Sequence, residues 1–104
     1  MILPKISEAI YELQAMNCKR EDMIIAFSPL IERFIIEELN TNYPINVAYR
    51  DVKELKYEGV VTYRLHPYNE IVVYDSVNCY YNPDLIIKIQ FNESRAHHLY
   101  IQPA

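Results

Sequence analysis

The spacing of the hydrophobic residues changes near position 43, and this change limits the chain to folds that combine helices with a sheet. Before this point, apolar residues recur every three or four positions over 5–17 and again from position 30 on. That spacing is typical of amphipathic helices. After it, apolar and polar residues alternate at 45–50 and 60–66, as expected of strands with one buried face.

Two helices separated by a short strand are predicted in the N-terminal part. The first helix covers 5–17, and the apolar run 23–27 is too short for a helix, so it predicts a buried strand. Ser28 is a suitable N-cap for the second helix, and Pro29 suits its first position. We expect this helix to end before Pro44, since residues preceding proline are disfavoured in helical conformation.

The remaining chain predicts a mainly antiparallel sheet. Strands are expected at the following segments: 45–50, 60–66, 71–74 and 85–91. A hairpin turn at 67–70 would join the second and third of them, and a loop covers 76–84. Alternation places Val61, Tyr63 and Leu65 on one face, which we expect to lie in the core or at its rim. A polar tail, 92–104, contains a short apolar stretch at 98–101 that predicts one more strand.

The predicted architecture is one α+β domain over residues 1–104. Its two N-terminal amphipathic helices, with the short intervening strand, pack on one face of a mainly antiparallel sheet. The single glycine, Gly59, excludes the Rossmann fingerprint and the P-loop, which need several glycines beside phosphate. We expect Gly59 to supply a positive φ or a bulge at the start of a strand.

Charge and hydropathy exclude several classes of protein. The net charge of −4 disfavours nonspecific binding to nucleic acid, which depends on Lys and Arg. No stretch approaches eighteen apolar residues, so no membrane span is expected. The first residues lack the basic-then-apolar layout of a signal peptide, and we therefore expect a cytoplasmic protein.

Catalytic and metal-binding motifs are not recognised, so we expect neither an enzyme nor a cofactor. Cys18 and Cys79 stand in unrelated contexts and are expected to be reduced and packed. A metal site of both cysteines with one histidine, and a Cys79 nucleophile beside His66 or His98, are alternatives that the spacing does not select.

Tyrosine is the unusual feature of the composition: the chain has ten, against three phenylalanines and no tryptophan. Tyr68, Tyr80 and Tyr81 fall in predicted turns and loops, where we expect them to be exposed. With Arg64 and His66 they form the predicted partner-binding surface, because tyrosine is enriched at interface hot spots. A genome rich in A and T would also raise the tyrosine content. Base stacking, with nearby lysines and arginines on phosphates, is a third interpretation.

Two runs of sequence carry a resemblance to known proteins. They are Glu21 to Leu30, followed by a helix, and Tyr57 to Arg64, followed by Glu70 to Asp75. Over about 21–75 the chain resembles small uncharacterised proteins of bacteriophages and mobile elements, and it is similar to part of the outer domain of tailed-phage capsid proteins. It departs from their pattern at Val61-Thr62. The resemblance implies a viral or prophage origin and assigns no functional residue.

These observations favour a non-catalytic, self-associating accessory protein that binds another protein. The resemblance implies that the partner belongs to a host or a competing element, which the protein would inhibit. Two alternatives remain open: a small single-stranded nucleic-acid or nucleotide binder, and a phage structural or assembly component.

Overall fold

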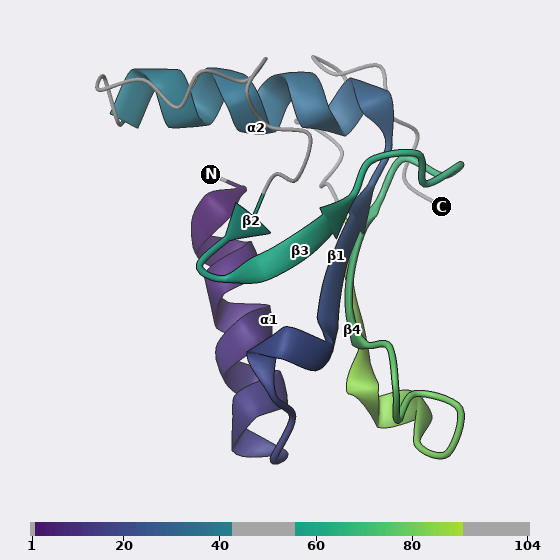
Figure 1. Cartoon of the computed structure of the whole chain (residues 1–104). Helices are drawn as coiled ribbons and strands as arrows, with labels where there is room; N and C mark the ends of the chain where they lie inside the picture. The colour runs from purple at the N-terminus through teal and green to yellow at the C-terminus, as the bar shows by residue number, and fades with distance from the viewer. Residues whose placement is uncertain (1, 43–55, 91–104) are drawn as a thin grey trace.

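Two helices cover one face of a five-stranded sheet in the computed structural model, which describes residues 2–42 and 56–90 (Figure 1). The elements, in chain order, are α1 (Leu3–Ala15), β1 (Met23–Phe27), α2 (Pro29–Asn42), β2 (Lys56–Tyr57), β3 (Val60–Tyr63), β4 (Ile71–Asp75) and β5 (Ile86–Ile89). Short 3-10 turns at Arg20–Asp22 and Pro83–Leu85 precede β1 and β5. This α+β architecture confirms the predicted fold class.

The ends of the helices follow from local sequence. The Ser28 Oγ accepts a hydrogen bond from the amide of Ile31 at 3.3 Å, so it caps α2 as predicted. At the C-terminal end of α1, Asn17 has a φ of 68°, and the amide of Cys18 donates a hydrogen bond to the carbonyl of Leu13 at 3.0 Å. This left-handed turn satisfies a carbonyl of the last helical turn. It ends α1 at Ala15, two residues earlier than predicted.

The sheet is mixed, in the order β2-β3-β1-β4-β5. Three of its pairings are antiparallel, and β1 pairs with β3 in parallel. The predicted hairpin at 67–70 is therefore wrong, because β1 lies between β3 and β4. The connecting segment 64–70 instead crosses the end of β1, where the amide of His66 donates to the carbonyl of Phe27 at 3.2 Å.

Both helices pack on the same face of the sheet. On β1 this face carries Met23, Ile25 and Phe27, each at most 1 % exposed. The main core cluster joins them to the following buried residues of the helices: Leu3, Ile6, Ala9, Ile10, Leu13, Ile31 and Ile35. Burying one apolar face of each element in this way is the main source of stability for a small α+β domain.

The turn between β2 and β3 accounts for the single glycine. Glu58 and Gly59 have φ values of 52° and 80°, so both central residues of this two-residue hairpin are left-handed. The predicted positive φ at Gly59 is confirmed. The Glu58 side chain accepts a hydrogen bond from Ser7 Oγ at 2.6 Å, and its carbonyl accepts one from Arg20 Nη1 at 2.6 Å. These bonds tie the turn to α1 and to the segment that follows it.

Several predictions lie outside the described residues. They are the strand at 45–50, the end of the last strand at Phe91, and the tail 92–104 with its strand at 98–101 and both of its histidines. Within the described ranges, no helix is long and apolar enough to cross a membrane.

Candidate functional site: the open face of the sheet

The sheet face opposite the helices is largely apolar. The pairing registers place the following side chains on it: Lys56 of β2, Val61 and Tyr63 of β3, Ile24 and Ala26 of β1, Val72 and Tyr74 of β4, and Ile86 and Lys88 of β5. We call this set the open face. Its charged members are Lys56 and Lys88, which lie on the two edge strands. An apolar sheet face without covering helices is uncommon in a small domain.

The prediction that Val61 and Tyr63 lie in or beside the core is wrong. Their side chains are 41 % and 50 % exposed, whereas Val60 is completely buried against the helices. In β3, apolar residues occupy both odd-numbered and even-numbered positions, so alternation alone cannot indicate which of the two sets faces the core. The register with β1 decides it, since Ile24 is opposite Val61.

The two tyrosines of the open face, Tyr63 and Tyr74, lie on the strands on either side of β1. Ala26 of β1 lies between β3, which carries Tyr63, and β4, which carries Tyr74; Ala26 and Val72 of β4 are both buried. Burial raises the pKa of Tyr74, and neighbouring ionisable groups raise it further; they are the Cys79 thiol and the phenols of Tyr63 and Tyr80. The aromatic cluster of the open face therefore reaches the loop after β4.

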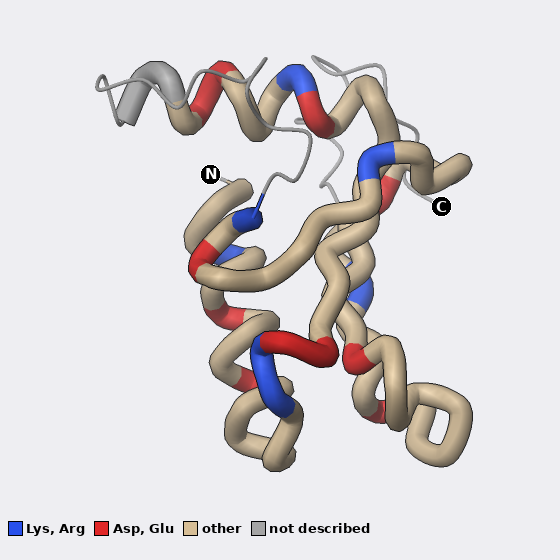
Figure 2. Tube along the Cα trace, viewed as in Figure 1, with Lys and Arg blue, Asp and Glu red and all other residues tan. Residues whose placement is uncertain are grey.

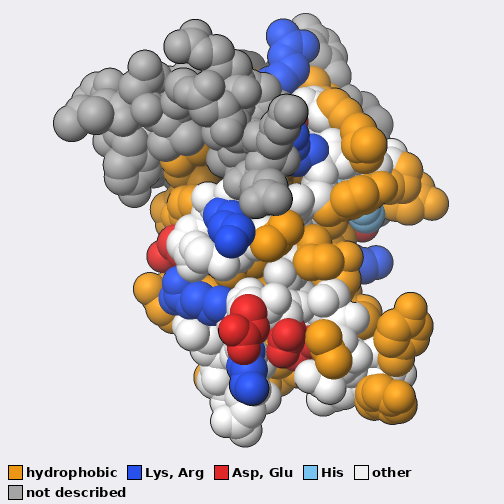
Figure 3. All heavy atoms as spheres, viewed as in Figure 1, with side chains coloured by type: hydrophobic (Ala, Val, Ile, Leu, Met, Phe, Trp, Pro, Cys, Tyr) orange, Lys and Arg blue, Asp and Glu red, His pale blue; other side chains and the backbone are white. Residues whose placement is uncertain are grey.

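The five predicted partner-binding residues do not form one continuous patch. Tyr68 is 68 % exposed, and it follows β3 at the end of the sheet where β1 finishes. Tyr80 and Tyr81, at 89 % and 88 %, lie on the loop after β4, where β1 begins. Figure 3 shows hydrophobic side chains at both places, on the turn after β3 and on the loop after β4. The exposure expected for these three tyrosines is confirmed, and the open face lies between the two groups.

Arg64 and His66, which complete the predicted surface, have partners within the fold. The Arg64 Nε lies 4.0 Å from a carboxylate oxygen of Glu32 on α2. The His66 Nε2 lies 3.1 Å from Glu70 Oε2, and the other oxygen of Glu70 accepts a hydrogen bond from Gln90 at 2.9 Å. Both side chains are thus turned toward structural contacts near the start of α2 and the end of β5.

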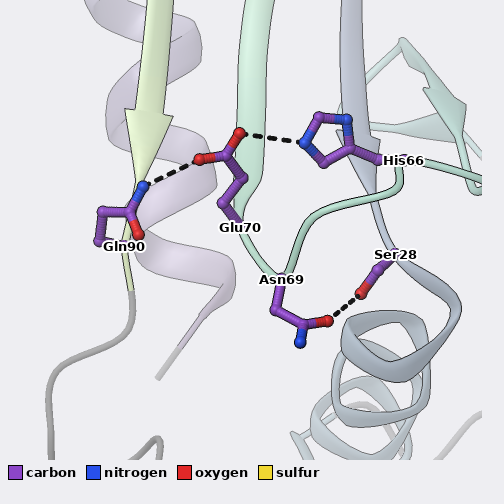
Figure 4. Close-up of polar contacts among 5 residues, drawn as sticks. All are labelled: Ser28, His66, Asn69, Glu70 and Gln90. Atoms are coloured by element: carbon purple, nitrogen blue, oxygen red, sulfur yellow. Dashed lines mark hydrogen bonds and ion pairs between the residues drawn. The ribbon is translucent and has the colours of Figure 1, made fainter. Parts of the chain in front are cut away.

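Two side-chain contacts, His66–Glu70 and Ser28–Asn69, hold the connecting segment 64–70 in place, and we call them together the polar clamp. Figure 4 shows the His66 ring turned toward Glu70, while the Ser28 hydroxyl is turned toward Asn69, to which it donates at 3.2 Å. Burial alone would raise the pKa of Glu70. The hydrogen bonds from His66 and Gln90, with the nearby positive charge of Lys88, outweigh burial and lower it.

This clamp fits a structural role better than nucleophilic catalysis. A serine nucleophile needs its hydroxyl directed at a base. Ser28 instead donates to Asn69 and accepts from the amide of Ile31. His66 and Glu70 do pair as a base and its orienting group would, but the hydroxyl they would activate is turned elsewhere (Figure 4).

The two alternative cysteine sites are not assembled within the described ranges. Cys79 follows β4 at the end of the sheet where β1 begins, whereas His66 lies at the end where β1 finishes. Cys18 and Cys79 are both free thiols. Among the residues that the structure describes, no three His, Cys, Asp or Glu side chains are placed to hold a metal ion. His98 lies outside those residues.

A hollow of about 390 Å³ at the edge of the open face also went unrecognised in the sequence. Its walls include Pro29 and Glu32 at the start of α2, together with Tyr63 and Leu65. Leu65 is 69 % exposed there. Only the tertiary structure brings the first turn of α2 beside the end of β3, because 32 residues lie between Glu32 and Leu65 in the sequence.

Positive charge is not concentrated on this surface. Figure 2 shows Lys and Arg interspersed with Asp and Glu along the described trace. Arg64 is turned toward Glu32, and Arg20 binds the carbonyl of Glu58. Within the described part of the chain, the strand registers place two lysines on the open face, Lys56 and Lys88, at its opposite edges.

Comparison with known proteins identifies no relative. No protein-family model, curated protein sequence or solved structure matches this chain. The resemblance to bacteriophage proteins therefore stays a prediction, and the function has to be argued from the surface itself.

Proposed function

We propose that this protein is a non-catalytic binding domain that recognises another protein through the open face of its sheet. The observation that carries the proposal is the exposed apolar and aromatic character of that face, with Val61 at 41 %, Tyr63 at 50 % and Ile86 at 38 % exposure. Tyrosine supplies a large contact area at low entropic cost and is typical of interface hot spots.

The size of the open face supports a protein partner. Four neighbouring strands, each four or five residues long, span roughly 15 Å by 15 Å at ordinary strand spacing. A patch of a few hundred Å² is the size at which exposed apolar surface marks interaction sites. Standard interfaces use about 800 Å² of each partner. Exposed residues at its ends, such as Leu65 and Tyr80, would extend the contact area.

The charges favour a protein over a nucleic acid. Stacked bases would suit Tyr63 and Tyr74, since single-strand binders present aromatic residues on a sheet. Such proteins also need cations beside the aromatic residues to bind phosphate. The open face offers only Lys56 and Lys88, at its two edges, while Arg64 is turned toward Glu32. Single-stranded nucleic acid is thus the second candidate, which the two tyrosines favour and the charge opposes.

Site-specific photocrosslinking tests the proposal. Tyr63 is replaced by p-benzoylphenylalanine, and Tyr11 on α1, which is 56 % exposed, receives the same replacement as the matched control. After irradiation in bacterial lysate, we expect a protein adduct at position 63 that is absent at position 11. An Ile86→Lys substitution should abolish that adduct, because it places a further charge in the apolar part of the open face.

The outcomes separate the candidates. An adduct made of two copies of this chain would identify the predicted self-association, and a host adduct would identify the inhibitor's target implied by the phage resemblance. Equal adducts at both positions, or none at position 63, would overturn the proposal. A labelled single-stranded oligonucleotide bound at low salt, with binding lost in Tyr63→Ala, would favour the second candidate.

A further inference from the structure

β5 is an edge strand, and within the described ranges no strand pairs with its outer side. The sheet order places it beside β4, with which it pairs in antiparallel fashion. In such a pair, alternate residues of an edge strand direct their N–H and C=O groups away from the neighbour. Among the described residues, no hydrogen bond outside the sheet engages the backbone of residues 87–89. This side of β5 therefore presents backbone donors and acceptors to which a further strand could bind.

A hollow of about 300 Å³ between α1 and β5 reaches this outer side, and we call it the β5 hollow. Residues from both faces of β5 line it: Ile87 and Ile89 from the face that packs on the helices, and Lys88 and Gln90 from the opposite face. Because β4 occupies the inner side of β5, a hollow lined from both faces extends past the outer side. The side chains of an added strand would lie at this position.

The lining of the β5 hollow suits apolar side chains. Ala9 of α1 is buried there, and Ile87 and Ile89 are partly buried against the core. Three exposed, charged residues of α1 surround this apolar part: Lys5, Glu8 and Glu12. Successive side chains of an added strand alternate between the two faces of the sheet, so every second one would enter the β5 hollow. We therefore expect apolar residues at those positions of a partner.

Lys88 indicates which residue of an added strand would lie on the opposite face. Its side chain is exposed on the open face, across from Val72. Among the described residues, no hydrogen bond or salt bridge engages its ammonium group. Its charge acts on Glu70, but that carboxylate is already held by His66 and Gln90 (Figure 4). An antiparallel strand on β5 would place one residue directly opposite Lys88, where an acidic residue stabilises the pair and a basic one destabilises it.

The same lysine disfavours a second copy of β5 as the added strand. In a symmetric antiparallel pair of two copies, one residue lies opposite its own counterpart. A pair centred on Lys88 would set two ammonium groups side by side, which is unfavourable. A pair centred on Ile87 would bring Ile89 opposite Leu85, which belongs to the 3-10 turn before the strand. A strand of different sequence, with an acidic residue at its centre, avoids both difficulties.

We propose that β5 binds an extended segment of another protein as an additional antiparallel strand, with an acidic residue opposite Lys88 and apolar residues on either side of it. The apolar residues would enter the β5 hollow beside Ala9, Ile87 and Ile89. Backbone hydrogen bonds would provide the affinity, and the alternating side chains the specificity. This inference does not depend on the proposed function, because the edge of the sheet carries it rather than the open face.

Two capped peptides test the proposal. Each alternates threonine and valine so that valine flanks the central residue, which is glutamate in one peptide and lysine in the other. We expect the glutamate peptide to shift the amide NMR signals of Ala9, Ile87 and Ile89. The lysine peptide should bind about fivefold more weakly, because it places like charges opposite each other. Lys88→Glu should reverse this preference, whereas Lys56→Glu, the matched charge change at the other edge of the sheet, should preserve it.

Methylation of backbone nitrogens in the glutamate peptide gives a second test, which does not alter the protein. Only every second N–H of an added strand points toward its neighbour. The peptide nitrogens therefore form two alternate sets. Methylation of one set should abolish the shifts, and methylation of the other set should retain them.

Several results would overturn the proposal. They are the absence of shifts at β5 with either peptide, equal binding of the two peptides, and the same behaviour of both methylated sets. Shifts of the β5 signals that depend on protein concentration alone would identify a second copy as the occupant, against the proposal. Peptide shifts confined to Val61 and Tyr63 would also overturn it, while supporting the open face as the binding surface.

Discussion

Asn78 donates two hydrogen bonds to the carboxylate of Asp75, one from its backbone amide to Oδ1 at 3.0 Å and one from its side chain to Oδ2 at 3.1 Å. The amide of Val77 donates to the same Oδ1 at 2.9 Å. Asp75 ends β4 and is completely buried, so its charge depends on these donors for solvation. The carboxylate therefore holds the start of the loop that carries Tyr80 and Tyr81.

Asp75→Ala is expected to lower the free energy of unfolding by about 2 to 4 kcal/mol, because it leaves two backbone amides without their acceptor. Urea denaturation followed by circular dichroism measures the loss. Asp84→Ala is the control, since Asp84 is an exposed carboxylate close to the same loop. A similar effect in both variants would show that the donors around Asp75 contribute little.

Acid should destabilise the protein through Asp75 and Glu70. Burial alone would raise the pKa of Asp75, but the hydrogen bonds from Asn78, Val77 and Cys18 outweigh it and lower the pKa in the folded state. The pKa of Glu70 is also lowered. Their contribution is complete above the ordinary carboxyl pKa values of about 4 and is lost as the pH falls through the lower, folded values.

Urea midpoints between pH 7 and pH 2.5 check this dependence. Asp75→Asn should flatten the acid side of the curve, because the titrating group is removed, while Asp84→Asn should leave the curve unchanged. An unaltered acid slope in Asp75→Asn would contradict the assignment.

Gly59→Val should destabilise the fold by about 1 to 3 kcal/mol. No atom outside the turn lies within 4 Å of a Cβ built at this position, so the cost comes from the φ of 80° rather than from a clash. Gly59→Asn, which tolerates a left-handed backbone better, should cost clearly less. Thermal unfolding compares the two, and equal losses would argue against backbone strain as the cause.

The two thiols should differ in reactivity. Burial of Cys18, followed by its hydrogen bond to Asp75 and by the nearby charges of Asp75 and Asp22, raises its pKa to about 11. At pH 8 roughly one thiol in a thousand would then be ionised, and the thiolate is the reactive form. Cys79 is partly exposed on its loop. We expect iodoacetamide to modify Cys79 first and Cys18 only on unfolding.

Intact-mass measurements over time follow this labelling. Cys79→Ser should leave a protein that resists modification until urea is added, and Cys18→Ser should react as fast as the native chain. Rapid double modification of the native protein would contradict the buried, hydrogen-bonded state of Cys18. In Asp75→Ala, Cys18 should react faster, since its charged neighbour has been removed.

The local sequence pattern was sufficient to predict those elements whose stabilising interactions join residues close together in the chain. The helical spacing, the Ser28 cap and the apolar run of β1 all predict elements that the structure contains. The exposure of Tyr68, Tyr80 and Tyr81 follows equally from their position in turns. Propensity, capping and turn chemistry act within a few residues, so one sequence can reveal them.

Which strands are neighbours in the sheet, and which face of each strand is buried, could be learned only from the tertiary structure. β1 separates β3 from β4, and no local signal distinguishes that order from a simple hairpin. The same parallel pairing directs Val60 toward the helices and exposes Val61 and Tyr63, although positions 60 and 61 are both valine. By itself, the sequence determined both helices, the strands β1, β3, β4 and β5, and the α+β class, but not the short edge strand β2. The long-range pairing of β1 with β3 decided which apolar face was buried and which remained open, because burial depends on partners that lie far apart in the chain.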